Sequence, residues 1–212
     1  MSTGGDGKLA DAAYRTVLEK ILSHELAGGS VIQERKLAEA MGVSRTPMRD
    51  ALGRLEGEGL LVRLTDRLLS VRVITLQDYL HSLDVRMMIE PQAAGLAVRS
   101  LTPNDIDMLR GELAALDADE GPELEGRHWR FDDLLHELLA ERSGNPFLSK
   151  LIREMRRYTK IFERQMVPPR RKPGLDDHGR ILDALATGRA EKARDAMSEH
   201  IRNVRKRILD GL

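Results

Sequence analysis

From Thr75 to the end of the chain, apolar side chains recur every three or four residues, which is the spacing of one face of an α-helix. Short groups of turn-forming residues separate these stretches, such as Gly121-Pro122, Ser143-Gly144-Asn145 and Thr187-Gly188. Aromatic residues make up only 3% of the chain, so one class of side chain that favours sheets is scarce. We therefore predict an all-helical antiparallel bundle over residues 75–212.

The N-terminal part of the chain contains three shorter helical patterns. The first runs from Lys8 to about Leu26 and stops at Gly28-Gly29, and the second begins at Gln33 and stops at Gly42. In the third, we expect Thr46 to cap the helix and Pro47 to occupy the first helical position, where its missing N–H costs no hydrogen bond.

Two short runs rich in Leu, Val and Ile follow the third helix. They cover Leu60–Leu64 and Leu68–Ile74, with the polar residues 65–67 between them, and this pattern predicts a small hairpin. Three helices followed by a hairpin are the order of elements in a winged helix-turn-helix. We predict such a domain over residues 1–74, with residues 1–7 disordered, ahead of the helical domain. The protein is therefore expected to be mainly α.

Charge and cysteine content limit the kinds of site that are possible. The 34 basic side chains are balanced by 34 acidic ones, so net charge alone does not indicate nucleic-acid binding. DNA binding would depend on where individual arginines lie. Cysteine is absent, so a metal ion would need histidine and carboxylate ligands. No stretch has the apolar length of a membrane helix or the pattern of a signal peptide, so we expect a cytoplasmic protein without a membrane partner.

A helix-turn-helix is indicated between the second and third helical patterns. Ala38 is small enough for two helices to cross closely, Gly42 allows a tight turn, and Val43 fills the space between the helices. The N-terminal end of the third helix would enter the major groove, where arginine can donate two hydrogen bonds to guanine. The candidate DNA-contacting residues are Arg35, Ser44, Arg45, Thr46 and Arg49. The alternative is an ordinary helical pair with a solvated charged face, and the pattern does not determine which arginine reads bases.

Three histidines of the C-terminal half have informative neighbours. Asp132 and His136 are four residues apart, so they share one face of a helix. His178 and His200 lie in the last two helical stretches, and three helices could converge on one ion. Three imidazoles and one carboxylate suit Zn, Ni, Fe, Mn or Co. Alternatively, each histidine is an ordinary surface or hydrogen-bonded residue, and Asp132 with His136 is a surface pair.

The N-terminal segment resembles the DNA-binding domain of the GntR family of bacterial regulators. The resemblance is carried by Gln33–Ala38, Val43–Leu52 and Leu55–Leu60. It implies that Arg35, Arg45 and Arg49 contact DNA, assisted by Ser44 and Thr46. One departure concerns the wing, where family members usually have glycine at the tip and this chain has Asp66–Ser70. Contact between this wing and the minor groove is therefore not implied.

Residues from about Thr75 to Leu212 resemble the helical ligand-sensing domain of the FadR-like subfamily, the FCD type. Val85–Pro91 and His136–Pro146 carry this resemblance. In metal-containing members, an Asp and a His four residues apart precede Ser-Gly-Asn, and each of the last two helices adds one His. The resemblance implies that the metal ligands are Asp132, His136, His178 and His200. It also allows Arg86 to face the ligand cavity and bind a carboxylate, and a salt bridge with Glu90 is equally compatible with the sequence.

These features predict a ligand-responsive transcriptional regulator, which we expect to be a repressor. A homodimer would bind a pseudo-palindromic operator in double-stranded DNA, and a metal ion (Zn, Ni, Mn or Fe) with a small organic acid would alter operator affinity. One alternative retains DNA binding and makes the metal purely structural. Another is a helical metalloenzyme that activates water. Because no separate general base is recognisable, we expect no enzyme activity.

Overall fold

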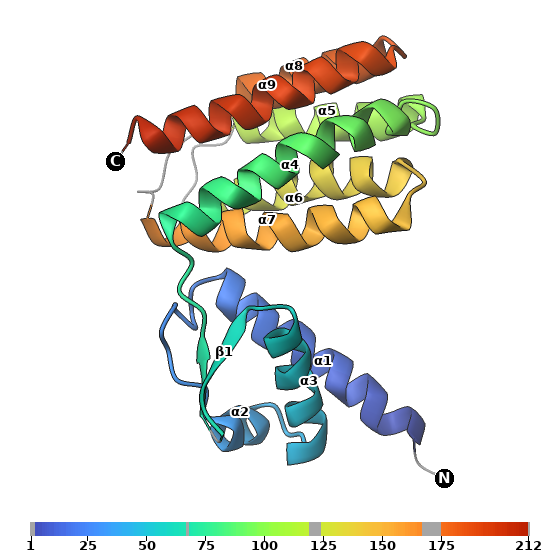
Figure 1. The fold of residues 1–212 in the computed structure, drawn as a ribbon. Helices are drawn as coiled ribbons and strands as arrows, with labels where there is room; N and C mark the ends of the chain where they lie inside the picture. Colours follow the sequence, from blue (N-terminus) through green and yellow to red (C-terminus); the bar gives the residue numbers. More distant parts are fainter. Residues whose placement is uncertain (1–2, 67, 119–123, 167–174, 212) are drawn as a thin grey trace. The chain divides into compact units, whose positions relative to one another are not determined.

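The protein is described by a computed structural model. The described residues are 3–66, 68–118, 124–166 and 175–211. They divide into two compact units, one formed by the residues up to Leu76 with Lys160–Met166, and the other by the remaining described residues. Figure 1 shows the helices and strands of each unit.

In the described residues before α4, the N-terminal unit contains three helices and a two-stranded antiparallel sheet. These are α1 (Thr3–Leu22), α2 (Glu34–Ala40), α3 (Arg45–Gly57), β1 (Leu61–Thr65) and β2 (Leu68–Val71). Leu61 pairs with Val71 at one end of the sheet, and the tip residue Arg67 of the predicted wing lies outside the described residues. Helices α1 and α3 pack together, and Ala13, Val17 and Leu55 are completely buried. The predicted winged helix-turn-helix is present in this unit (Figure 1).

Helix α1 begins earlier than predicted. We expected residues 1–7 to be disordered, and the structure places Thr3–Gly7 in the first turns of α1, whereas residues 1–2 lie outside the described part. The expectation was therefore wrong for residues 3–7. Once a helix has formed over the sequence from Lys8 onward, each further residue adds one backbone hydrogen bond without a new nucleation cost. The glycines weaken this extension and do not prevent it.

The end of α1 also differs from the prediction. The helix ends at Leu22, not at about Leu26. His24 adopts a φ of 66°, in the left-handed region, which cannot continue a right-handed helix. The N–H of Leu26 then donates to the carbonyl of Lys20 at 2.8 Å. The chain therefore leaves the helix before it reaches the two glycines that predicted the stop.

Helix α3 begins two residues earlier than predicted. Ser44, not Thr46, is the N-cap residue, with φ −73° and ψ 168°, and its side chain makes no capping hydrogen bond. Pro47 is consequently the third helical residue and not the first. The first four N–H groups of a helix have no partner within the helix, so proline costs no hydrogen bond at this position either.

The helical unit is a bundle of six helices in the described residues. They are α4 (Leu76–Ala97), α5 (Pro103–Asp117), α6 (Leu124–Arg142), α7 (Pro146–Met166), α8 (Leu175–Ala186) and α9 (Ala190–Leu209). Short connections join α6 to α7 and α8 to α9, so the helices of each pair run antiparallel (Figure 1). Thr102 and Asp105 form a capping box at the start of α5, each side chain accepting a hydrogen bond from the other residue's N–H. The six helices confirm the predicted helical domain.

Leucine and isoleucine side chains from several helices fill the core of the bundle. Leu109, Leu135, Leu139, Ile152 and Ile181 are each at most 2% exposed. Among the described residues, none of the helices has both the length and the apolar character needed to cross a bilayer.

Candidate metal centre and nucleic-acid interface

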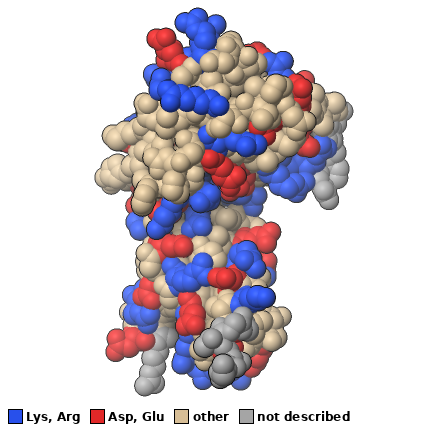
Figure 2. Space-filling view, turned by 90° about the vertical axis from the view of Figure 1, so that its right-hand side faces the viewer, with Lys and Arg blue, Asp and Glu red and all other residues tan. Residues whose placement is uncertain are grey.

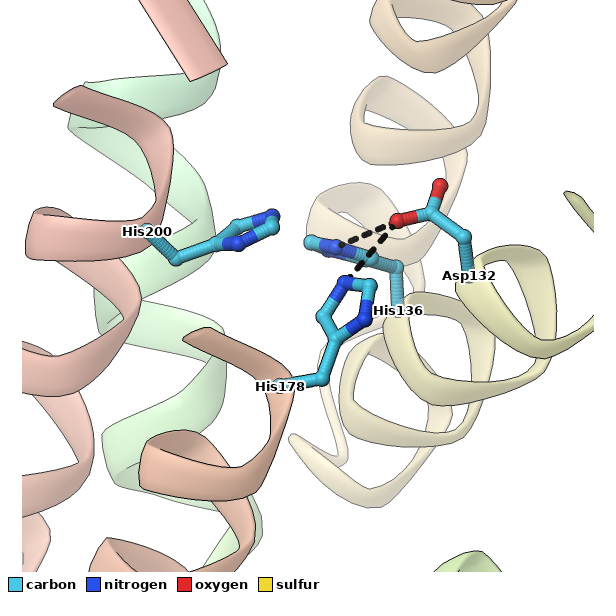
Figure 3. Close-up of side chains that lie close together, drawn as sticks. All are labelled: Asp132, His136, His178 and His200. Atoms are coloured by element: carbon cyan, nitrogen blue, oxygen red, sulfur yellow. Dashed lines mark ion pairs between the residues drawn. The ribbon is translucent and has the colours of Figure 1, made fainter. Parts of the chain in front are cut away.

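Four side chains from three helices meet inside the helical unit. Asp132 and His136 come from α6, His178 from α8 and His200 from α9 (Figure 3). One ligand atom from each residue lies within 4.8 Å of the ligand atoms of the other three. The ring of His200 is 4.9 Å from that of His178 and 5.2 Å from that of His136, measured between centroids. The structure thus brings together the four residues that the sequence predicted as metal ligands.

Helix geometry explains why these residues meet. The four-residue spacing on α6 places Asp132 and His136 one turn apart on the same face. Helices α8 and α9 pack against each other after the turn at Gly188, which has a φ of 68°. His178, near the start of α8, therefore lies beside His200, which is in the second half of α9.

The three imidazoles are buried without partners for several of their nitrogens. His136, His178 and His200 are each at most 3% exposed. In the described part of the chain, Nε2 of His136, Nδ1 of His178 and both ring nitrogens of His200 have no hydrogen-bond partner, and Nε2 of His178 lies 3.2 Å from Oδ1 of Asp132. A buried polar atom without a partner costs free energy, so such a cluster needs a compensating ligand. A metal ion would bind one nitrogen of each of the three imidazoles.

The separations between ligand atoms suit a metal ion after a small movement. Oδ1 of Asp132 lies 3.2 Å from Nε2 of His178 and 3.7 Å from Nε2 of His136. Ligand atoms bound at about 2.1 Å from one ion are about 3 to 4 Å apart. The widest separation of 4.8 Å exceeds this range, so the cluster would contract slightly on binding. Nitrogen and carboxylate donors in this number fit a divalent transition metal.

The protonation states of the cluster also suit a metal. Burial lowers the pKa of His136 and His200, and nearby positive charge adds to the effect, from Arg156 in the case of His136. Burial alone would raise the pKa of Asp132, but Arg156 and the hydrogen-bonding contact with His178 hold that pKa well below its ordinary value. Neutral imidazoles and an ionised carboxylate are the forms that bind metal ions.

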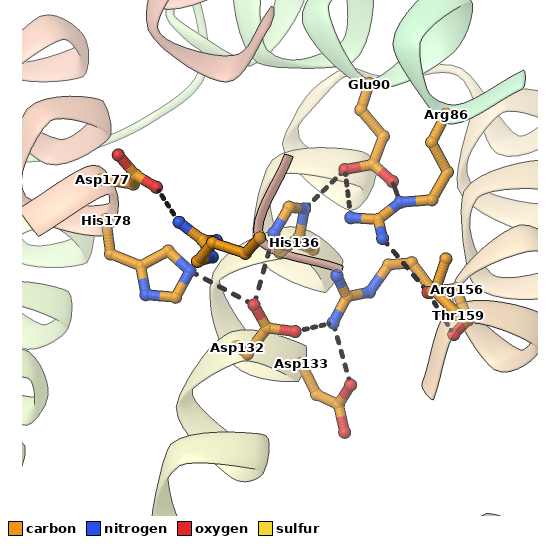
Figure 4. A network of polar contacts seen from close by, with 10 residues as sticks. Arg86, Glu90, Asp132, Asp133, His136, Arg156, Thr159, Asp177 and His178 are labelled. Carbon is orange, nitrogen blue, oxygen red and sulfur yellow. Dashed lines mark hydrogen bonds and ion pairs between the residues drawn. The ribbon is translucent and has the colours of Figure 1, made fainter. Parts of the chain in front are cut away.

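Glu90 on α4 orients one of the imidazoles. Its Oε2 atom lies 2.6 Å from Nδ1 of His136, and both side chains are buried (Figure 4). Burial would raise the pKa of Glu90, but Arg86 and His136 lower it, so this carboxylate is ionised and accepts the Nδ1 proton. The lone pair of His136 is then on Nε2, the atom that faces the cluster.

Arg86 on α4 is bonded to the same carboxylate. Its Nε donates to Oε1 of Glu90 at 2.5 Å, and one Nη atom donates to the hydroxyl of Thr159 at 3.1 Å (Figure 4). The side chain of Arg86 is 4% exposed. The salt bridge between Arg86 and Glu90, one of the two alternatives from the sequence, is therefore present in the structure.

Arg156 on α7 contacts the cluster and was not identified from the sequence. One Nη atom lies 2.6 Å from Oδ2 of Asp132 and 3.0 Å from Oδ1 of Asp133 (Figure 4). These bonds leave Oδ1 of Asp132 facing the imidazoles. A signal did exist, because Arg156 lies four residues after the buried Ile152 and three before the buried Thr159, so it interrupts the buried face of α7.

The candidate DNA-contacting arginines lie at the start of α3 and on α2. Arg45 and Arg49 have side chains 66% and 60% exposed, and the Nε atom of each lies 3.0 Å from Oε1 of Glu34. Arg35 is 80% exposed and lies 3.7 Å from Glu39, a partner on the same helix. Ser44 and Thr46 are exposed at the same end of α3. The structure thus gathers all five candidate residues around the helix-turn-helix.

Basic and acidic side chains are interspersed over the N-terminal unit on the face drawn in Figure 2. This agrees with the chain's net charge of zero. DNA binding on this face would therefore not depend on a large positively charged surface. Recognition would depend on individual arginines and on the helix N-terminus, which suits phosphate oxygens.

Comparison with known proteins connects the two units to one family. Residues 9–67 match the model of the bacterial regulatory proteins of the gntR family, and residues 81–203 match the FCD domain. The chain belongs to the GntR family. It is a DNA-binding transcriptional regulator of the GntR type with an FCD domain, which confirms the resemblance noted from the sequence.

Several full-length relatives of this GntR regulator share between a quarter and a third of its sequence. The Nta operon transcriptional regulator of Aminobacter aminovorans is 29% identical, with 89% of each chain covered. LutR of Bacillus subtilis is 28% identical, with 87% of this chain and 94% of LutR covered. A protein of Escherichia coli named as a putative L-lactate dehydrogenase operon regulatory protein is 27% identical, with 92% and 82% covered.

Solved structures of related proteins have the same fold. McbR/YncC of E. coli superposes with a TM-score of 0.81 at 22% identity, covering 95% of this chain and 97% of its own. A GntR protein from Rhodococcus sp. RHA1 gives a TM-score of 0.77 at 22% identity, covering 96% and 98%. The family and the named relatives are transcriptional regulators, so the metalloenzyme alternative is not supported.

Proposed function

We propose that this regulator is a homodimeric repressor whose DNA affinity depends on a bound metal ion and a small carboxylate. Residues 1–74 would bind the operator, and residues 75–212 would bind the ion and the effector and form the dimer. The metal ligands would be Asp132, His136, His178 and His200. Since the operator is chromosomal DNA, the protein would act in the bacterial cytoplasm.

The main support for the metal is the set of buried, unpartnered imidazole nitrogens. Four ring nitrogens of three histidines lack hydrogen-bond partners among the described residues, and the carboxylate that faces the imidazoles is that of Asp132. A purely structural core would fill this volume with apolar side chains more favourably. In metal-containing relatives, as noted above, residues at these positions form the metal site.

The donor set leaves room for an effector. Four protein ligands on a five- or six-coordinate ion such as Zn, Ni, Mn or Fe leave one or two positions open, and the ion would act there as a Lewis acid toward a carboxylate. Asp132 is the most exposed member of the cluster, at 23% of its side chain, so the effector would approach from its side. The name of the E. coli relative, which refers to L-lactate dehydrogenase, makes L-lactate a reasonable first acid to test.

Two arginines are candidates to contact the effector. Arg156 bonds to Oδ2 of Asp132, so its guanidinium lies beside the cluster. Arg86 is a weaker candidate, because Glu90 and Thr159 already occupy its donors. A planar guanidinium can form two parallel hydrogen bonds to a carboxylate, which would orient the acid.

On the DNA side, we propose that the start of α3 enters the major groove. Arg45 and Arg49 would contact bases or phosphates, with Ser44 and Thr46 assisting, and Arg35 would contact the neighbouring backbone. Two copies of this element in a symmetric dimer would read two half-sites about one DNA turn apart. An effector that favours one dimer arrangement would therefore change operator affinity.

The experiment uses duplex DNA that the wild-type protein selects from a random pool. Affinity for this DNA is measured by fluorescence anisotropy with zinc-loaded protein, with chelator-treated protein, and after adding small organic acids, beginning with L-lactate. We expect at least one acid to weaken DNA binding by the loaded protein and to have no such effect on chelator-treated protein or on His178→Ala and His200→Ala variants.

A purely structural metal is the second candidate function for the ion, because the four ligands join three helices. It would be favoured if the chelator-treated protein melted at a much lower temperature and still released DNA normally on addition of the acid. Equal acid responses in the wild type and in both histidine variants would contradict the proposal.

A further inference from the structure

A single carboxylate at the start of α2 holds both arginines at the start of α3. Oε1 of Glu34 accepts a hydrogen bond from Nε of Arg45 at 3.0 Å and from Nε of Arg49 at 3.0 Å. Oε2 lies 3.1 Å from the same Nε atom of Arg49. The Glu34 side chain is 27% exposed, whereas those of the arginines are more than half exposed. The three residues thus form a triad across the helix-turn-helix.

The charge state of this triad is well defined. Partial burial would raise the pKa of Glu34, but hydrogen bonds and charges from Arg45 and Arg49 outweigh it and lower that pKa. Glu34 is therefore ionised at neutral pH. The triad carries one positive charge in place of two, which reduces its attraction for DNA phosphates in general.

The donors that Glu34 engages matter for base recognition. A guanidinium has five N–H donors, and Glu34 bonds to Nε of each arginine. The outer edge, formed by the two Nη atoms, is not used in these bonds and can donate two parallel hydrogen bonds to O6 and N7 of guanine. Because the long side chains are already held, less conformational entropy is lost when they meet a base.

We propose that Glu34 is a specificity-determining residue, which orients Arg45 and Arg49 toward guanine and weakens their contacts with phosphates. The inference rests on the proposed function, because it requires that the start of α3 reads the major groove. It does not depend on the metal or on the effector. The effect on DNA binding has two opposite parts, with affinity for the selected sequence increased and affinity for unrelated sequences decreased.

Two variants separate orientation from charge. Glu34→Gln removes the negative charge and keeps the length of the side chain. Glu34→Asp keeps the charge and is one methylene shorter, so its carboxylate cannot reach both Nε atoms in the present geometry. The matched control is Asp11→Asn, because Asp11 on α1 pairs with Arg54 near the other end of α3 at 2.6 Å and carries the same charge.

Affinities are measured by fluorescence anisotropy at two salt concentrations. The probes are a duplex selected from a random pool by the wild type and a shuffled duplex of the same length and composition. We expect Glu34→Gln to bind the selected duplex about tenfold more weakly, at the low end for a weakened arginine–guanine contact. The same variant should bind the shuffled duplex as tightly as the wild type or more tightly. Glu34→Asp should bind the selected duplex more weakly and the shuffled duplex no more tightly than the wild type does. Asp11→Asn should keep the wild-type ratio of the affinity for the selected duplex to the affinity for the shuffled duplex.

Different failures have different meanings. If Glu34→Gln binds both duplexes more tightly by the same factor, Glu34 only neutralises the arginines and the inference is wrong. If Glu34→Gln and Glu34→Asp both keep the wild-type ratio of the two affinities, the inference is also wrong, while the proposed contact between α3 and DNA stands. If Arg45→Ala and Arg49→Ala bind the selected duplex like the wild type, the proposed role of α3 fails, and this inference fails with it.

Discussion

The carboxylate of Glu90 and the imidazole of His136 form a buried hydrogen bond, with 2.6 Å between Oε2 and Nδ1. The two residues are 46 positions apart in the chain and belong to α4 and α6. Glu90 does not belong to the four-residue cluster, yet it sets which nitrogen of His136 carries the proton. The bundle therefore supports the cluster from outside as well as forming it.

Replacing Glu90 by glutamine should weaken metal binding. The amide cannot hold the Nδ1 proton as strongly, so His136 becomes a poorer and less well oriented ligand. We expect zinc affinity to fall about 10- to 100-fold, as measured by competition with a chromophoric chelator. Glu141→Gln, a change of the same kind at an exposed site on α6, should leave it unchanged. Equal affinities for Glu90→Gln and the wild type would show that Glu90 does not orient His136.

Arg156 should stabilise the fold through its two aspartates. Arg156→Gln would remove the cation that bonds to Asp132, whose side chain is only 23% exposed, and to Asp133. We expect the free energy of unfolding to fall by about 2 to 3 kcal/mol in urea. The exposed pair of Arg110 and Asp183 is the control, because Arg110→Gln should cost about 0.5 kcal/mol or less. Similar losses in both variants would contradict this account of Arg156.

Acid should destabilise the metal-free protein through its buried imidazoles. Burial, with the charges of His178 and His136, lowers the pKa of His200, so the unfolded chain takes up protons more readily than the folded one. Stability should be fully present above the ordinary histidine pKa of about 6.5 and decline as pH falls below it. The melting temperature of chelator-treated protein, measured at pH 7.5 and 5.5, tests this sign.

A pair of variants assigns the acid effect. His200→Gln should reduce the drop in melting temperature between pH 7.5 and 5.5, because the glutamine does not titrate. His81→Gln replaces an exposed histidine on α4 and should leave the drop unchanged. A melting temperature that does not change with pH in the wild type would show that the buried imidazoles do not resist protonation.

The two helix starts should respond differently to loss of a hydroxyl. Thr102→Ala removes the capping box of α5 and should lower the free energy of unfolding by about 1 kcal/mol. Ser44→Ala removes a hydroxyl that makes no capping bond in α3 and should cost less than about 0.5 kcal/mol. Only Ser44→Ala should weaken binding to the selected duplex. The opposite order of stability losses would contradict the two cap geometries.

Elements whose signals are local were predictable from the sequence. The four-residue spacing of Asp132 and His136 places them on one face of a helix, whatever the helix packs against. The turn at Thr187-Gly188 was equally predictable, because glycine readily adopts the positive φ that ends a helix, and Gly188 has a φ of 68° in the structure. The resemblance then related this pair to the two later histidines, and the structure brings all four together.

Contacts between distant segments were not predictable in the same way. Spacing gave no sign that Glu90 would reach His136, because that contact depends on how α4 packs against α6. The bond of Arg156 to Asp132 likewise depends on the packing of α7. The end of α1 was mispredicted for a different reason: the left-handed residue that follows the helix is His24, whereas glycine is the residue that usually marks such a position in a sequence.

The most direct test of the central claim is the metal content of the purified protein. Wild-type protein is expressed in cells grown in medium supplemented with transition metals, and the number of ions per chain in the purified protein is measured by mass spectrometry. Chelator-treated samples are titrated with zinc to count the binding sites. The account predicts close to one ion per chain, and a large loss of affinity in His200→Gln and His178→Gln with the helical circular dichroism signal retained. Wild-type protein that purifies without metal and binds no zinc, or variants that bind it as tightly, would contradict the account.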